Sequence, residues 1–332
     1  MLYTPLTTAL GLRVPLVSAP FSVATPAMVA AVSNAGALGL YSVTWRTPDA
    51  IRARLTDIQE RTPHPFGVNL VLEWDMRERL QVCLEAGVRV VSLWWGNPEP
   101  YIDMAHEAGA KVLFTVGSVA EAERAVRAGA DVIVAQGWEA GGHVRGQMTT
   151  FTLLPQVVDA VDVPVIAAGG IGDGRGLAAA LMLGASGAWI GTRFLMAVEA
   201  AVHDDYREQL RRAQGDDTTH TWLFNEGWQG PHRVLRNSTV EAWQNAGEPP
   251  VGQRPDEGET IAWTATGEPL NRYDFNSPAA NMIGNLEAMA LYAGQSVGLI
   301  SSEQRAQPAG EIVTDLFGEA RRALNRAVHL LP

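Results

Sequence analysis

A glycine-rich loop near the middle of the chain holds the residue best suited to acid–base chemistry. His143 follows two glycines in the stretch Ala135–Gly146, directly after the apolar run Asp131–Ala135. A neutral imidazole at the end of a strand could take a proton from carbon near neutral pH. Gln136 in the same stretch can donate and accept hydrogen bonds, so it either contacts a bound ring or polyol or braces the loop.

Two further glycine-rich stretches have the composition of a phosphate site. Ala168–Gly176 reads Ala-Gly-Gly-Ile-Gly-Asp-Gly-Arg-Gly, and Ile190–Phe194 reads Ile-Gly-Thr-Arg-Phe. Glycine lets backbone N–H groups approach an anion, and the N-terminus of a following helix adds its positive end. Either stretch alone is equally well explained as a tight turn. Both together predict a phosphate cradle, with Asp173 as a helix cap rather than a ligand.

Other polar candidates have simpler explanations. Glu139 is expected to brace the loop rather than act as a base, and Asn69 either contacts a ligand or braces a strand end. A lone histidine is more often structural than catalytic, so we expect turn or exposed-helix positions for four others. These are His64, His106, His203 and His329.

A repeat over residues 1–199 indicates the elements that position these loops. A helix-like segment ends in Ala-Gly or Leu-Gly and an apolar strand follows at once, as at Gly87, Gly109 and Gly129. Glycine suits the left-handed turn after a helix, and apolar strands alternating with amphipathic helices indicate a covered parallel sheet. The prediction is an α/β fold, a (β/α)8 TIM barrel whose chemistry lies at the carboxyl ends of the strands. The eight strands are expected to begin near Val14, Ala37, Phe66, Val88, Lys111, Asp131, Pro164 and Gly187.

The alternation stops after the eighth predicted strand. Residues 200–277 are expected to form an inserted cap, because they hold too many aromatic side chains for a disordered tether. Residues 278–332 are expected to return to the barrel as helices, with an amphipathic helix over Pro278–Leu299 and a closing helix over Glu311–Leu331. The aromatic residues of the cap include Trp222, Phe224, Trp228, Trp243 and Trp263.

Composition excludes several classes of partner. A net charge of −11 with no basic stripe argues against nucleic-acid binding, which depends on clustered Lys and Arg. The sequence has no run of about 18 apolar residues that would predict a membrane span, and the N-terminal sequence lacks the pattern of a secretion signal. The one cysteine, Cys83, excludes a disulfide and fits a reducing cytoplasm. We therefore expect a cytoplasmic enzyme that is a monomer or a homodimer.

In these stretches the chain resembles the flavin-dependent nitronate monooxygenases, also called 2-nitropropane dioxygenases, and through them the flavin-type enoyl-acyl carrier protein reductases. The Glu-Ala-Gly-Gly-His loop joined to Ala-Ala-Gly-Gly-Ile and Gly-Thr-Arg-Phe is more specific than any one piece. The matching stretches cover nearly the whole predicted barrel and part of the returning segment. They are residues 19–20, 33–39, 66–70, 136–143, 167–176, 184–194 and 292–296.

The resemblance implies an FMN at the mouth of the barrel. His143 would take the α-proton of a nitroalkane, giving a nitronate that reduces the flavin before O2 completes the oxidation to a carbonyl compound and nitrite. The phosphate would be held by Gly169, Gly170, Gly191 and Thr192. The ring and ribityl chain would be lined by Ala19, Pro20, Phe21, Asn69, Gln136, Gly141, Gly142 and Gln295.

The same residues leave two alternatives open. One is an FMN-dependent NAD(P)H:quinone or enoyl-thioester reductase, and the other is a phosphate- or flavin-binding barrel without redox turnover. Phe21 stands where the family usually has methionine, which could alter the shelf beneath the ring. Trp94 and Trp95 either narrow the substrate space or pack in the core. The natural substrate is not predicted.

Overall fold

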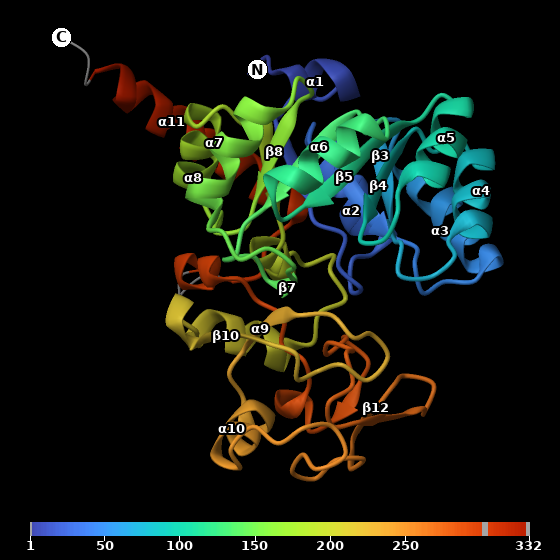
Figure 1. Ribbon diagram of the computed structural model, residues 1–332, viewed down its shortest axis with the longest axis vertical. Coiled ribbons are helices and arrows are strands. Elements are labelled where there is room, and N and C mark those ends of the chain that lie inside the picture. The colour runs from blue at the N-terminus through green and yellow to red at the C-terminus, as the bar shows by residue number, and fades with distance from the viewer. Residues whose placement is uncertain (1, 301–304, 330–332) are drawn as a thin grey trace.

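Within residues 2–300 and 305–329, which the computed structural model describes, eight parallel strands close into a barrel (Figure 1). Neighbouring strands follow the order β1-β9-β8-β6-β5-β4-β3-β2. Leu38 closes the ring, because its N–H donates to Leu16 O (2.9 Å) and its carbonyl accepts from Ser18 N (3.0 Å). The predicted TIM barrel is confirmed, and each strand begins within two residues of its expected start. The strands are β1 (Leu16–Ser18), β2 (Gly39–Ser42), β3 (Phe66–Val71), β4 (Val90–Trp94), β5 (Lys111–Val116), β6 (Val132–Gln136), β8 (Val165–Ala168) and β9 (Gly187–Ile190).

Amphipathic helices cover the outer face of the barrel. Side chains of Thr25, Thr47 and Ser118 cap three of them by accepting a backbone N–H. Beyond the helix ends, Gly87 and Gly129 have φ of +86° and +101°, the left-handed turn expected from the repeat. The helices are α2 (Pro26–Asn34), α3 (Pro48–Arg61), α4 (Arg77–Glu85), α5 (Glu99–Glu107), α6 (Val119–Arg127), α7 (Thr150–Ala160) and α8 (Gly174–Met182).

The amino-terminal end of the barrel is closed by the short helix α1 (Pro5–Leu10). Leu6 of this helix packs with strand side chains that point into the barrel, such as Leu40 and Ile166. A Cβ at Gly187 would lie 2.6 Å from Leu6 Cδ2, so glycine is needed there for the plug to fit. Because this end is filled, a ligand has access only from the carboxyl ends of the strands.

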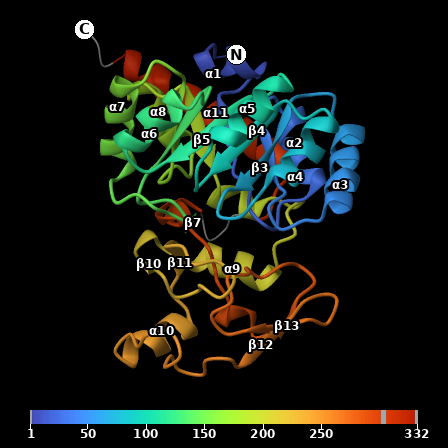
Figure 2. The same ribbon diagram turned by 45° about the vertical axis from the view of Figure 1, so that its right-hand side comes forward.

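An ordered cap lies across the carboxyl ends of the strands, below the barrel in Figures 1 and 2. It holds two small sheets, β10-β11-β7 and β13-β12-β14. In the first of them, the cap strand β11 pairs with β7, which belongs to the loop after β6. The elements are β7 (Gly142–His143), α9 (Asp204–Arg212), a 3-10 turn (Gly215–Asp217), β10 (Thr218–Thr221), β11 (His232–Leu235), α10 (Ser238–Asn245), β12 (Thr260–Trp263), β13 (Pro269–Asn271) and β14 (Ile283–Gly284).

The prediction of a helix over Pro278–Leu299 is wrong. The chain there forms β14 and two 3-10 turns, Leu286–Ala288 and Gln295–Leu299. Gly294 explains part of the difference, because its N–H donates to Thr192 Oγ1 (3.0 Å), a contact between distant segments that a continuous helix would not make.

The closing helix is confirmed as α11 (Ala309–Val328), and the end of its predicted span, at Leu331, lies outside the described residues. The helix packs mainly on α8 and also on α2. Its apolar face contributes Ile312, Val313 and Leu316 to the core around the barrel. Contact with α8 is very close, since a Cβ at Gly174 would lie 2.3 Å from Glu319 Cβ.

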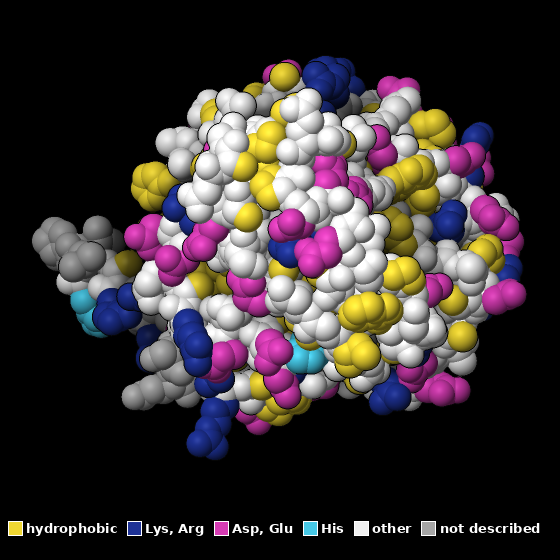
Figure 3. All heavy atoms as spheres, turned by 90° about the horizontal axis from the view of Figure 1, so that it is seen from below, with side chains coloured by type: hydrophobic (Ala, Val, Ile, Leu, Met, Phe, Trp, Pro, Cys, Tyr) yellow, Lys and Arg dark blue, Asp and Glu magenta, His cyan; other side chains and the backbone are white. Residues whose placement is uncertain are grey.

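None of the helices that the structure describes is long and apolar enough to cross a membrane. On the face seen from the cap side, basic side chains are spread among acidic and apolar ones (Figure 3).

Gly174→Ala is expected to destabilise the protein by about 1–3 kcal/mol, because the new methyl group overlaps the backbone and side chain of α11. Urea unfolding followed by circular dichroism measures the change. Gly318→Ala is the matched control within α11, where the nearest atom to the new Cβ is Arg322 Nη1 at 3.5 Å. It should be neutral or stabilise the helix by up to about 1 kcal/mol. Equal stability of the two variants would contradict the close packing of α8 and α11.

Candidate active site

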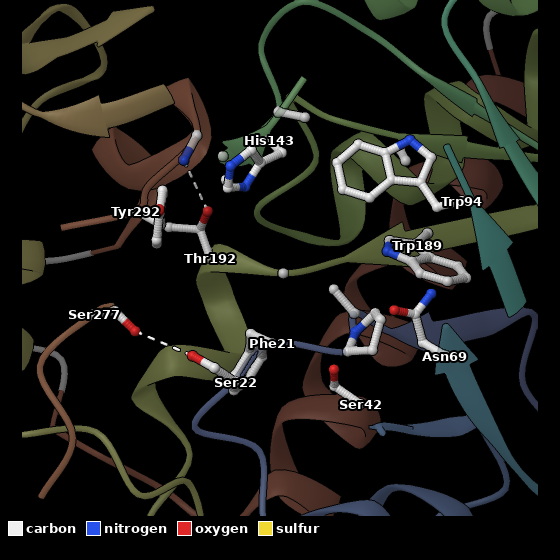
Figure 4. Close-up of a pocket in the computed structure, with 18 of the residues that line it drawn as sticks. Phe21, Ser22, Ser42, Asn69, Trp94, His143, Trp189, Thr192, Ser277 and Tyr292 are labelled. Atoms are coloured by element: carbon white, nitrogen blue, oxygen red, sulfur yellow. Dashed lines mark hydrogen bonds between the residues drawn. The ribbon is translucent and has the colours of Figure 1, made fainter. Parts of the chain in front are cut away.

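A cavity of about 530 Å³ opens at the carboxyl ends of the barrel strands, between the barrel and the cap (Figure 4). Each of the eight barrel strands contributes to its wall at or just after its last residues. The predicted site residues that line it are Ala19, Pro20, Phe21, Asn69, Gln136, Gly141, Gly142, His143, Gly169, Gly170, Gly191 and Thr192.

Gln295 is the predicted site residue that the structure does not bring to the cavity. Its side chain is exposed, and its N–H donates to Glu139 O (2.9 Å). The neighbouring Gly294 and Ser296 line the cavity instead. The displacement follows from the 3-10 turn, which directs successive side chains differently from the expected helix.

Glycines of the loops after β8 and β9 line the cavity. Gly169 and Gly170 have φ of +96° and +72°, which glycine adopts without strain. A Cβ at Gly169 would lie 3.0 Å from Gly137 O, and one at Gly191 would lie 3.3 Å from Ala19 Cβ. These residues fit the close approach of a phosphate to the backbone.

The N-terminus of α8, beside these loops, already binds carboxylates. Asp173 accepts from Arg175 N (2.9 Å) and Gly176 N (3.2 Å), which confirms its predicted role as the helix cap. Glu319 of α11 accepts from Gly174 N (2.8 Å). We expected this helix end to add its positive charge to the phosphate site, and the structure corrects this because its first N–H groups have partners.

Side chains from the strand ends line the barrel side of the cavity (Figure 4). Asn69 is buried, and its Nδ2 donates to Ser92 Oγ (3.1 Å). Phe21 follows β1 and packs partly against the core. Trp189 of β9 also reaches the cavity, a residue that the sequence did not single out. The wall is therefore largely apolar, with a few amide and hydroxyl groups.

The cap fixes the position of His143. β7 pairs antiparallel with β11, which sets His143 opposite His232. The indole of Trp228 stacks on the imidazole, with ring centroids 3.5 Å apart and planes at 19°. A Cβ at Gly230 would lie 2.8 Å from His143 Cδ2, so this cap loop also packs directly on the ring. Only 7% of His143 is exposed, so its imidazole is packed in place and is not free to swing over a ligand.

Burial favours the neutral form of His143 and of its neighbour His232. Burial, and to a smaller extent His232, lowers the pKa of His143 well below its ordinary value of 6.5. Its Nε2 is buried and has no hydrogen-bond partner among the residues of the described chain. Burial, opposed by the bond to Gly230, lowers the pKa of His232 to about 4. The bonds of His232 suit the neutral ring, because Nδ1 donates to Gly230 O (2.8 Å) and Nε2 accepts from Phe224 N (3.2 Å).

Polar side chains brace the loop that carries His143. Gln136 Nε2 donates to the backbone carbonyl of His143 (3.1 Å) while the side chain also lines the cavity. The carboxylate of Glu139 accepts from Thr150 N (2.8 and 3.1 Å) and Thr150 Oγ1 (3.1 Å). The bracing role predicted for Glu139 is confirmed.

Trp94 and Trp95 belong to an aromatic cluster centred on Trp228. Their ring centroids lie 5.7 and 5.5 Å from that of Trp228. Trp94 lines the cavity, and Trp95 lies under the guanidinium of Arg145, whose Cζ is 4.8 Å from the ring centroid. Trp94 therefore narrows the cavity, whereas Trp95 lies outside the cavity wall and packs against Trp228.

Trp228 and Tyr292 are cavity residues that the sequence analysis missed. We expected Trp228 only as one of several aromatic residues of the cap. A usable signal lies in residues 227–232, which read Gly-Trp-Gln-Gly-Pro-His. Two glycines and a proline around an indole indicate a tight loop. Nothing local indicates which side chain that loop meets.

The family comparison agrees with this geometry. A family model described as nitronate monooxygenase matches residues 4–78 and 72–319. The chain belongs to this family. As a member of the nitronate monooxygenase family it is a flavin-dependent oxidoreductase, which excludes the alternative of a barrel without redox turnover.

Individual relatives are named for different activities. The chain is 40% identical to a (3aS,4S,5R,7aS)-5-hydroxy-7a-methyl-1-oxo-octahydro-1H-indene-4-carboxyl-CoA dehydrogenase of Mycobacterium tuberculosis, over 72% of this chain and 68% of that one. It is 31% identical to a nitronate monooxygenase of Pseudomonas aeruginosa, over 95% of this chain and 98% of that one. The activities for which these relatives are named thus differ in substrate.

Solved structures are similar over nearly the whole chain. FabK from Thermotoga maritima has a TM-score of 0.86 at 34% identity, with 100% of both chains covered. Nitroalkane oxidase from Streptomyces ansochromogenes has a TM-score of 0.78 at 27% identity, over 98% of this chain and 100% of that one. The relation to the flavin-type enoyl-acyl carrier protein reductases is therefore confirmed along with the family.

We expect kcat/KM for a neutral nitroalkane to stay constant as the pH falls through 6.5 and to decline only at lower pH. A buried imidazole with a depressed pKa remains an unprotonated base in that range. Trp228→Ala should admit water to the ring and raise its pKa, so the acidic limb should move to higher pH. Measuring kcat/KM from about pH 5 to 9 for the unmodified protein and for Trp228→Ala locates the acidic limb of each profile.

Trp222→Ala is the matched control, because Trp222 is a cap tryptophan that is 57% exposed and outside the cavity wall. Its profile should match that of the unmodified protein. An acidic limb centred at 6.5 in the unmodified protein, or no shift in Trp228→Ala, would contradict the role given to burial.

Proposed function

We propose that this chain oxidises nitronates and neutral nitroalkanes with O2 to a carbonyl compound and nitrite, with FMN as cofactor. The observation that carries the proposal is the imidazole of His143, a neutral base in the wall of the cavity. Its Nε2 lacks a partner among the described residues, and a buried polar atom of this kind is suited to a ligand. The nitronate monooxygenase of P. aeruginosa, at 31% identity over nearly full length, supports the substrate class.

For a neutral nitroalkane the first step is loss of the proton on the carbon next to the nitro group. His143 accepts this proton, and the electron pair of the broken C–H bond forms the carbon–nitrogen double bond of the nitronate. The imidazolium loses solvation in its buried position, and the adjacent nitronate anion compensates with its opposite charge. The stack with Trp228 keeps the ring in one orientation during the transfer.

FMN, when bound, supplies the redox chemistry that passes electrons to O2. The chain contributes binding and orientation. The phosphate would be held by Gly169, Gly170, Gly191 and Thr192. Ser296, rather than Gln295, lines the cavity with them. The ribityl chain and ring would be lined by Ala19, Pro20, Phe21, Asn69, Gln136, Gly141 and Gly142.

A second candidate is oxidation or reduction of a CoA thioester, with NAD(P)H as the source of hydride for the reduction. The 40% identity to the M. tuberculosis carboxyl-CoA dehydrogenase favours it. The proton chemistry is the same, because the carbon next to a thioester carbonyl is also a weak acid that a neutral imidazole can deprotonate. Arg46, at the wall of the cavity, adds a positive charge that suits the phosphates of a CoA thioester.

Anaerobic mixing separates the two candidates. A nitronate should bleach the flavin of the purified protein within seconds if the first candidate is correct. Bleaching by NADPH or NADH, with no response to nitronates, would replace it with the second.

His143→Asn is expected to retain the flavin and to lose oxidation of neutral nitroalkane by about two to four orders of magnitude, the usual contribution of a general base. Activity on the preformed nitronate should fall far less, since its proton is already gone. Initial rates of O2 consumption on the two forms measure this. His64→Asn, at an exposed turn position, is the matched control and should leave both rates unchanged.

Equal losses on the nitroalkane and the nitronate would refute the assignment of His143 as the base. The flavin absorbance of the variant shows whether a loss comes from cofactor release.

A further inference from the structure

A second pocket of about 460 Å³ opens at the rim of the barrel, next to the cavity already described. The two share Trp45 and Phe275 in their walls, so a ligand could extend from one into the other. Trp74, Asp75 and Arg79 complete most of the polar and aromatic lining of this rim pocket. The proposed reaction at His143 uses none of these residues.

Two indoles of the rim pocket are partly exposed to solvent. Trp45 is 45% exposed and Trp74 is 38% exposed, with ring centroids 6.1 Å apart and planes at 69°. Large aromatic side chains left in water at a cavity mouth are typical of binding sites, since their faces can stack on a flat ring. A heteroaromatic base gains most from such a surface.

Arg79 lines the rim pocket, and Arg46 lines the adjoining main cavity. Arg79 Nε donates to the backbone carbonyl of Arg46 (3.0 Å), which ties together the two residues from neighbouring segments of the rim. Arg46 lies over the ring of Tyr41, with its Cζ 4.9 Å from the centroid. Neither guanidinium forms an ion pair with a carboxylate of residues 2–300 or 305–329. The only other charged residue of the rim pocket in this part of the chain is Asp75.

The charge of Asp75 is already compensated. Arg77 donates to both of its carboxylate oxygens (2.6–3.1 Å), and this holds the pKa of the Asp75 carboxyl well below its usual range. The rim pocket is thus locally positive on a chain whose net charge is −11. An anion with a flat ring fits this combination, because guanidinium binds phosphate oxygens through several hydrogen bonds.

The geometry points to a binding site for an adenosine diphosphate group at the rim, with the base on Trp45 and Trp74 and the phosphates at Arg46 and Arg79. CoA thioesters and NAD(P)H both carry this group, and both have a reactive end that would enter the cavity beside His143. The inference rests on the proposed flavin oxidoreduction for the identity of that reactive end. It gives the second candidate function a physical site, and it also provides for a dinucleotide reductant.

Binding of ADP to the flavin-loaded protein, measured by isothermal titration calorimetry, tests the site. Bound flavin keeps the phosphate cradle of the main cavity filled, so the probe reports on the rim. Arg79→Gln and Arg46→Gln should each weaken ADP binding by about ten-fold or more through loss of charge-assisted hydrogen bonds. Trp74→Ala should weaken it by a similar factor through loss of stacking.

Matched controls remove the same side chains elsewhere. Arg127→Gln, an exposed arginine of α6, and Trp222→Ala should leave ADP binding unchanged. Arg79→Lys keeps the charge and should restore part of the affinity, which separates a local fold defect from loss of a contact. Absence of saturable ADP binding, or equal binding by the rim variants and the controls, would overturn the proposal.

Competition identifies the source of the adenosine diphosphate group. CoA should displace ADP if the site serves a thioester substrate, and NADPH or NADH should displace it if the site serves a reductant. Displacement by none of them would overturn the proposal. Because ADP binding does not depend on turnover, failure of nitronate oxidation with intact rim binding would refute the proposed function and leave the rim site standing.

Discussion

The site depends on the contact between a two-residue strand of the His143 loop and the cap. A loop this rich in glycine has a large conformational entropy, and by itself it would not hold an imidazole in one orientation. Pairing of β7 with β11 supplies that order, and the stack of Trp228 on the ring adds to it. The same contact removes the ring from water and so keeps it neutral. Position and protonation state thus have one physical origin.

The fold of the barrel could be predicted because its signals are local. Glycine after each helix, apolar strands and helix caps act over a few residues, and their repetition gave eight strand positions close to the observed ones. The prediction of a helix over Pro278–Leu299 failed because the signals that set its path are not local. Its apolar spacing resembles that of a helix, but its path is set by contacts with Thr192 and Glu139, which lie more than a hundred residues earlier.

The candidate site was predictable in its residue types and not in its surroundings. Glycines at strand ends and a histidine in a flexible loop can be identified from the sequence, and they line one cavity. The burial of His143 could not be predicted, since it comes from Trp228 and Gly230 in the cap. The same holds for Glu319, whose bond to Gly174 joins segments 145 residues apart. Tertiary contacts of this kind leave no periodic trace in the sequence.

The bond between Glu319 and the first N–H group of α8 has a consequence for biosynthesis. The glycine loop after β8 leads directly into α8, so this loop is supported by a helix that is synthesised well after the barrel strands. While only the barrel strands have left the ribosome, the N–H of Gly174 at the start of α8 would lack the carboxylate of Glu319 as its partner. Stable binding of the flavin would therefore follow synthesis of residues 309–328.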